Sequence, residues 1–89
     1  MTRDEVRSTV IGHLRELVPG TATKEIDDQM PLADLGADSL DLVDVASRSM
    51  QDLGVKLPRS AIGKIHSLSD LIDALYQECL AAEAAGATA

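Results

Sequence analysis

Apolar residues recur at helical spacing in three stretches of the chain. The stretch at 3–18 places Val6, Val10, Ile11, Leu14, Leu17 and Val18 on one stripe. The stretch at 39–53 places Leu42, Val43, Val45, Ala46, Met50 and Leu53 on one broad arc that would face a core. The stretch at 68–82 does the same with Leu68, Leu71, Ile72, Leu75, Tyr76, Cys79 and Leu80. Because these spacings follow the 3.6-residue helical period, each stretch predicts an amphipathic helix.

Local signals mark the ends of these three helices. Each is preceded by a capping box, in which the side chains of the N-cap and of the third helical residue bond each other's backbone. The pairs are Thr2 with Glu5, Asp38 with Asp41, and Ser67 with Asp70. Residues 19–20 (Pro-Gly) and Gly54 predict the ends of the first two helices. The last is expected to end near residue 82, which leaves 83–89 as a disordered tail.

Two connections complete the predicted fold. Residues 21–37 form a long loop whose apolar residues would anchor it to the helices; they are Ile26, Met30, Leu32 and Leu35. Residues 55–58 read as extended because the residue before a proline avoids helical geometry. A short helix is expected at 59–65, with Ala61, Ile62 and Ile65 inward and Gly63 weakening it. The prediction is one all-α domain at 1–82, a four-helix bundle with a long loop after its first helix and a short third helix.

The net charge of −7 is concentrated in one part of the chain. Between residues 25 and 52 there are eight acids and a single base, Arg48. Such a field repels nucleic acid and anionic membranes and favours basic protein partners, although a solvated face would have the same composition. The sequence has no apolar run of membrane-spanning length, its first residues turn acidic without the apolar core expected of a signal peptide, and it has one cysteine, Cys79. We therefore expect a soluble cytoplasmic monomer.

Ser39 is the candidate functional residue. With Asp38 as N-cap, it is the first residue of the predicted helix at 39–53, near the positive end of the helix dipole. That position favours an anion such as a phosphate ester. The plain alternative is a small residue in a capped first turn. Neither histidine, His13 or His66, has a sequence context that places a base beside Ser39, and no metal-ligand spacing is present. We therefore expect no catalytic residue and no metal site, and a serine that another protein modifies.

A candidate docking surface adjoins this serine. Leu40 projects from the polar face of the predicted helix, which also carries Asp41, Asp44 and Arg48. An outward leucine within an acidic field suits a partner that charge steers and one apolar side chain anchors.

The stretch at 34–41, Asp-Leu-Gly-Ala-Asp-Ser-Leu-Asp, resembles the prosthetic-group attachment motif of acyl carrier proteins, and the resemblance extends over residues 3–80. It implies that a phosphopantetheinyl transferase attaches 4'-phosphopantetheine from coenzyme A to Ser39, next to Asp38. The arm would carry acyl groups as thioesters among acyl-loading, ketosynthase and other acyl-transferring enzymes. Leu40, Asp41 and Asp44 match the family's recognition helix, and the family's bundle can shelter an acyl chain between its helices.

Departures from the family pattern narrow this expectation. Fatty-acid carriers usually have further acids where residues 47–51 and 58–64 carry Arg48, Arg59 and Lys64. The mixed surface is more like a discrete carrier from polyketide or hybrid secondary metabolism, such as antibiotic biosynthesis, than the housekeeping carrier of fatty-acid biosynthesis. Two alternatives remain. A peptidyl carrier would be loaded with an amino acid, although its motif usually has a second glycine where Ala37 and Asp38 stand. An unmodified helical adaptor would use the acidic face alone.

Overall fold

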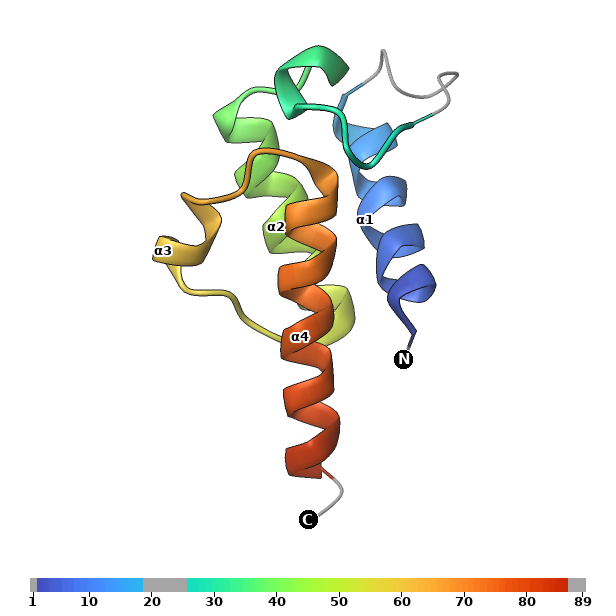
Figure 1. The fold of residues 1–89 in the computed structure, drawn as a ribbon, viewed down its shortest axis with the longest axis vertical. Coiled ribbons are helices and arrows are strands. Elements are labelled where there is room, and N and C mark those ends of the chain that lie inside the picture. Colours follow the sequence, from blue (N-terminus) through green and yellow to red (C-terminus); the bar gives the residue numbers. More distant parts are fainter. Residues whose placement is uncertain (1, 19–25, 87–89) are drawn as a thin grey trace.

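The computed structural model describes residues 2–18 and 26–86. Over these ranges the chain forms α1 (Arg3–Leu17), the 3₁₀ helix η2 (Leu32–Leu35), α2 (Ser39–Leu53), α3 (Arg59–Ile62) and α4 (Leu68–Gly86). Helices α1, α2 and α4 run alongside one another, and the short α3 stands to one side between two extended segments (Figure 1). The predicted all-α fold with four helices, the third of them short, is confirmed.

The three capping boxes form as predicted. At α1, the Thr2 hydroxyl accepts a hydrogen bond from the Glu5 N–H at 3.2 Å. At α4, the Ser67 hydroxyl accepts from the Asp70 N–H at 3.3 Å, while the Asp70 carboxylate accepts from the N–H groups of His66 and Ser67. These bonds satisfy N–H groups that have no partner inside the helix, so helix starts are decided within a few residues of chain.

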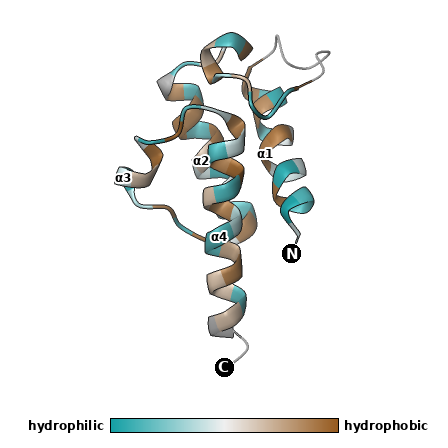
Figure 2. Ribbon diagram, viewed as in Figure 1, coloured by the Kyte–Doolittle hydropathy of each residue, from teal (hydrophilic) through white to brown (hydrophobic). Residues whose placement is uncertain are grey.

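The core is aliphatic and lies between α1, α2 and α4. Helix α1 packs against both of the others, and brown apolar bands alternate with teal polar ones along all three (Figure 2). The apolar side chains that are fully buried are Val6, Val10, Leu14, Val45, Ala46, Leu68, Leu71, Ile72 and Leu75. Burying a side chain of this size stabilises the fold by about 1.5–3 kcal/mol, so this set is the main source of stability.

Polar contacts and apolar anchors hold the described part of the first connection against the bundle. Ile26, Leu32 and Leu35 are buried, as predicted. The Arg7 Nε–H donates to both carboxylate oxygens of Asp28, at 2.9 and 3.0 Å. The Leu32 N–H donates to the His66 carbonyl at 3.1 Å, in an isolated bridge beside the start of α4. The connection is therefore fixed at the end of the bundle where α2 begins (Figure 1).

Two predicted helix ends differ from the structure. The third helix ends at Ile62 instead of residue 65, because Gly63 caps it after one turn, although Ile65 is buried beyond it. The expected end of the last helix near residue 82 was wrong: α4 continues to Gly86 through a run rich in alanine, the strongest helix former. Of the predicted tail, 83–86 is therefore helical and 87–89 lies outside the described residues. The helix η2 was not predicted, and the predicted stop at 19–20 falls outside the described residues.

Candidate functional site

A sharp turn places the start of α2. Gly36 ends η2 with φ of +83°, in the left-handed region that favours glycine. Its N–H bonds the Ala33 carbonyl at 3.1 Å, and the next N–H, of Ala37, bonds the Leu32 carbonyl at 3.2 Å. Asp38 then adopts the extended conformation of an N-cap, with φ of −104° and ψ of −174°. The chain therefore turns at Gly36 and enters α2 at Ser39.

Asp38 and Asp41 form the predicted capping box at this end of α2. The Asp38 carboxylate accepts from the Asp41 N–H at 2.9 Å, and the Asp41 carboxylate accepts from the Asp38 N–H at 3.1 Å. Ser39 is the first residue of a 15-residue helix, at the end where the dipole is positive. This is the backbone position that the sequence predicted for it; its modification stays a prediction.

The exposed edge of α2 is only partly as predicted. Leu40 is 75% exposed, which confirms its outward position. Val43 was expected to face the core, and this was wrong: it is 45% exposed. Val43 lies at the border of the buried arc, on the side of α3, and a helix of four residues is too short to cover it. Leu40 and Val43 thus give α2 an apolar edge beside its acids.

Charged residues near that edge are available to solvent. Asp44 is exposed and makes no side-chain hydrogen bond or ion pair among the described residues. The same holds for Arg48, one helical turn further along. Asp41 is half-buried, with its carboxylate in the capping box. The structure therefore brings the four predicted docking residues onto one helix, and their role in docking remains a prediction.

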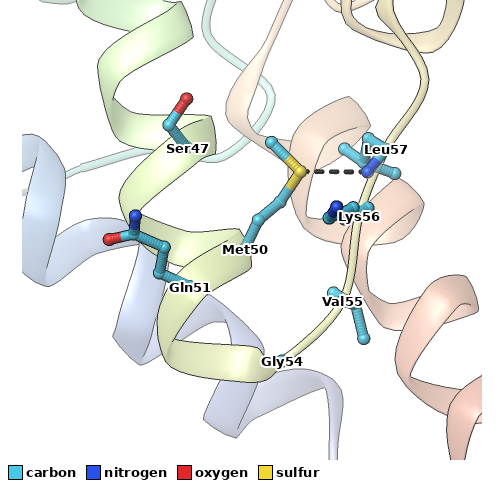
Figure 3. Close-up of a pocket in the computed structure, with 7 residues that line it drawn as sticks. All are labelled: Ser47, Met50, Gln51, Gly54, Val55, Lys56 and Leu57. Atoms are coloured by element: carbon cyan, nitrogen blue, oxygen red, sulfur yellow. Dashed lines mark hydrogen bonds between the residues drawn. The ribbon is translucent and has the colours of Figure 1, made fainter.

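A groove separates α2 from α3 and the extended segment before it. Its volume is about 670 Å³, and its walls are Leu42, Val43, Ser47, Met50, Leu57, Arg59, Ile62, Gly63, Ile65 and His66. A second hollow shares Leu42, Ile65 and His66 with it and reaches Asp38. A third shares Ser47, Met50 and Leu57 and continues to Lys56, as Figure 3 shows. The hollows therefore follow α2 from its N-cap to its last turn.

The sequence did not indicate two residues of this region. His66, in the turn before α4, lines the hollow that reaches Asp38. Ser49 is fully buried on the core side of α2, and its hydroxyl has no hydrogen-bond partner in the described part of the chain. Helical periodicity around Ala46 could have marked Ser49 as a core position, but the position of His66 in the hollow that reaches Asp38 depends on how two distant segments pack.

Other chemistry is sparse. Residues 2–18 and 26–86 contain no cluster of three or more potential metal ligands. None of their helices combines the length and the apolar character needed to span a bilayer. His13 contacts Asp52, at the far end of α2 from Ser39. Cys79 is buried in the core, and burial raises the pKa of its thiol. The described part of the chain thus shows a helix start, a groove and an exposed edge.

Sequence comparison relates most of the chain to proteins that carry phosphopantetheine. The phosphopantetheine attachment site family matches residues 10–75. A polyketide biosynthesis acyl-carrier-protein of Bacillus subtilis, AcpK, is 24% identical over 78 residues, which is 88% of this chain and 95% of that one. An acyl carrier protein of Thermotoga maritima is 31% identical over 71 residues, covering 80% of this chain and 88% of its own.

Solved structures share the fold. A crystal structure of an acyl carrier protein from Thermotoga maritima superposes with a TM-score of 0.74 at 21% identity, covering 85% of this chain and 88% of that one. The solution structure of the acetyl actinorhodin acyl carrier protein from Streptomyces coelicolor superposes with a TM-score of 0.65 at 23% identity, covering 92% and 94%. The arrangement of helices in Figure 1 is therefore the arrangement of these two proteins.

Proposed function

Because this chain belongs to the acyl carrier protein family, whose members carry covalent 4'-phosphopantetheine, we propose that Ser39 is the attachment residue. The observation that carries the proposal is the position of Ser39: it follows the N-cap Asp38 directly and opens α2. It also lies in the stretch at 34–41 that resembles the attachment motif, within the matched residues 10–75.

The start of α2 fits a phosphate ester. The first N–H groups of a helix and its dipole favour an anion, and only a side chain in the first turn is close enough to benefit. The Asp38–Asp41 capping box keeps this turn ordered. The bound arm would supply a terminal thiol that carries acyl groups as thioesters. The residues of this chain would hold the arm's phosphate and shelter the cargo in the groove between α2 and α3.

The exposed edge of α2 would be the surface that partner enzymes recognise. Leu40 offers an apolar anchor, and Asp41 and Asp44 attract a basic surface. Arg48 adds one opposite charge, which would select partners with mixed surfaces. The partners would be a phosphopantetheinyl transferase and the enzymes that load and transfer acyl groups. The chain itself would act as a carrier and not as a catalyst.

The pathway proposed is polyketide or related secondary metabolism. Its support is the name of the Bacillus subtilis relative and the cations at 48, 59 and 64. An amino acid is the alternative cargo. Incubation with adenylating enzymes tests this alternative. Formation of an aminoacyl thioester on the chain would show that its cargo is an amino acid and not an acyl group.

The attachment is tested by intact mass after incubation with coenzyme A and a broad-specificity phosphopantetheinyl transferase. We expect one phosphopantetheine on the wild-type chain and none on Ser39→Ala. Ser47 is another serine of α2, so Ser47→Ala is the matched control and should still gain one phosphopantetheine. An unchanged mass for the wild type would favour the adaptor, which needs no prosthetic group.

A further inference from the structure

The polar residues that line the groove and its continuation toward the end of α2 are all hydrogen-bond donors, and none of them is acidic. They are Ser47, Gln51, Lys56, Arg59 and His66. Each offers a hydrogen-bond donor, and two carry a permanent positive charge. No Asp or Glu is among the described residues that line these two hollows, although the chain has 15 acids and 8 Lys or Arg. The charged side chains that line these two hollows therefore have the opposite sign to the net charge of the chain.

Lys56 and Arg59 are not engaged in holding the fold together. Both are exposed, and neither side chain has a hydrogen bond or ion pair among the described residues. The cations of α1 differ: Arg3 bonds Asp73 at 2.7 Å, and Arg7 bonds Asp28. No acid occurs between residues 53 and 69 that could pair with the groove cations locally. Their charges are therefore available to an occupant of the groove.

The rest of the wall is apolar. Val43, Met50 and Ile62 are only partly covered, and they face the same space as Arg59. Figure 3 shows Lys56 next to Leu57 and Met50 where the hollow reaches the end of α2. An aliphatic chain would bury its methylene groups on these side chains. A carboxylate at its far end would meet the Arg59 guanidinium in the groove, or the Lys56 ammonium with the Ser47 and Gln51 donors in its continuation.

We infer that the acyl group carried by this protein ends in a carboxylate, which Lys56 and Arg59 bind at the far side of the groove. The inference rests on the proposed carrier function and specifies its cargo. An acidic patch on a partner protein would be attracted by the same two cations, so the experiment has to separate cargo from partner.

Two cargoes of equal length make this test. A phosphopantetheinyl transferase would load the chain from octanoyl coenzyme A or from suberoyl coenzyme A, which differs only in that a carboxylate replaces the terminal methyl group. Proton–nitrogen correlation NMR then reports the backbone N–H groups of Lys56 and Arg59 and the Arg59 Nε–H. We expect these signals to shift further in the suberoyl form, and the extra shift to diminish at high salt because ions screen the pair.

Matched variants locate the effect. Arg59→Gln and Lys56→Gln should each reduce the extra shift at the remaining groove residues. Lys64→Gln removes a charge from the same segment but does not line the groove, and it should leave the extra shift in place. Equal shifts for the two cargoes, or an equal loss in Lys64→Gln, would overturn the inference. Intact mass keeps this outcome apart from failure of the carrier function, since failure of the carrier function leaves the chain unloaded.

Discussion

The sulfur of Met50 accepts a hydrogen bond from the backbone N–H of Leu57 at 2.9 Å (Figure 3). The bond joins the last turn of α2 to the extended segment that leads into α3. Leu57 is buried, so its N–H would otherwise be a buried donor without a partner. A thioether is a weak acceptor, yet here it fixes the segment that forms the far wall of the groove.

Replacing Met50 by leucine should loosen that segment. The volume is nearly conserved, so the loss is mainly the hydrogen bond, and we expect the free energy of unfolding to fall by about 1 kcal/mol. Hydrogen exchange at the Leu57 N–H should become faster. Met30→Leu is the control, because the Met30 sulfur makes no hydrogen bond among the described residues. Unchanged exchange at Leu57 would show that the sulfur does not hold the segment.

Loss of the cap at Asp38 should destabilise α2. Asp38→Ala removes the acceptor for the Asp41 N–H, and such changes cost about 0.5–2 kcal/mol. Asp38→Asn keeps an acceptor oxygen and should retain most of the stability. Asp34→Ala changes an exposed acid with no side-chain hydrogen bond in the described structure, and urea unfolding should not distinguish it from the wild type. A similar cost for both alanine variants would argue against the capping role.

Ser49→Ala should stabilise the protein. The Ser49 hydroxyl is fully buried without a partner, and a group in that state costs about 1–3 kcal/mol. Ser47→Ala controls for the higher helix propensity of alanine, because Ser47 is exposed on the same helix. Thermal unfolding should show a larger gain for Ser49→Ala than for Ser47→Ala. A loss of stability in Ser49→Ala would mean that the hydroxyl is bonded in solution.

Variants of the exposed edge of α2 should separate docking from folding. Leu40→Ala and Asp44→Lys should raise the KM of the phosphopantetheinyl transferase for this chain. Because both side chains are exposed, the free energy of unfolding should change by no more than about 0.5 kcal/mol. Leu80→Ala, which alters an exposed leucine of α4, should leave KM unchanged. Unfolding of either α2 variant would show that its side chain is structural.

Cys79 should be protected from thiol chemistry in the folded chain. Burial raises the pKa of its thiol, so a smaller fraction is thiolate at pH 8 than in the unfolded chain. Alkylation by iodoacetamide, followed by intact mass, should be slower without urea than with it. Because the fold favours the neutral thiol, Cys79 contributes stability that is lost as the pH rises above about 9, the usual pKa of a cysteine thiol. Equally fast alkylation in both conditions would contradict this protection.

The helix starts were predictable from sequence because a capping box is complete within four residues. Thr2–Glu5, Asp38–Asp41 and Ser67–Asp70 all form as expected. The amphipathic stripes likewise predicted most of the core, since burial on a helix follows its period. The exposure of Leu40 followed from the same period.

Non-local packing decided the rest. Val43 is exposed because α3 is one turn long and stands apart from α2. The pattern of residues 39–53 contains no information on the separation of the two helices. The Met50–Leu57 bond and the place of His66 beside the start of α2 depend in the same way on where separate segments meet. The sequence by itself determined the helices, their caps and the position of Ser39, since these follow from contacts a few residues apart. Only the tertiary structure decided the groove and the charges that face it, because they arise where α2 and α3 do not close on each other.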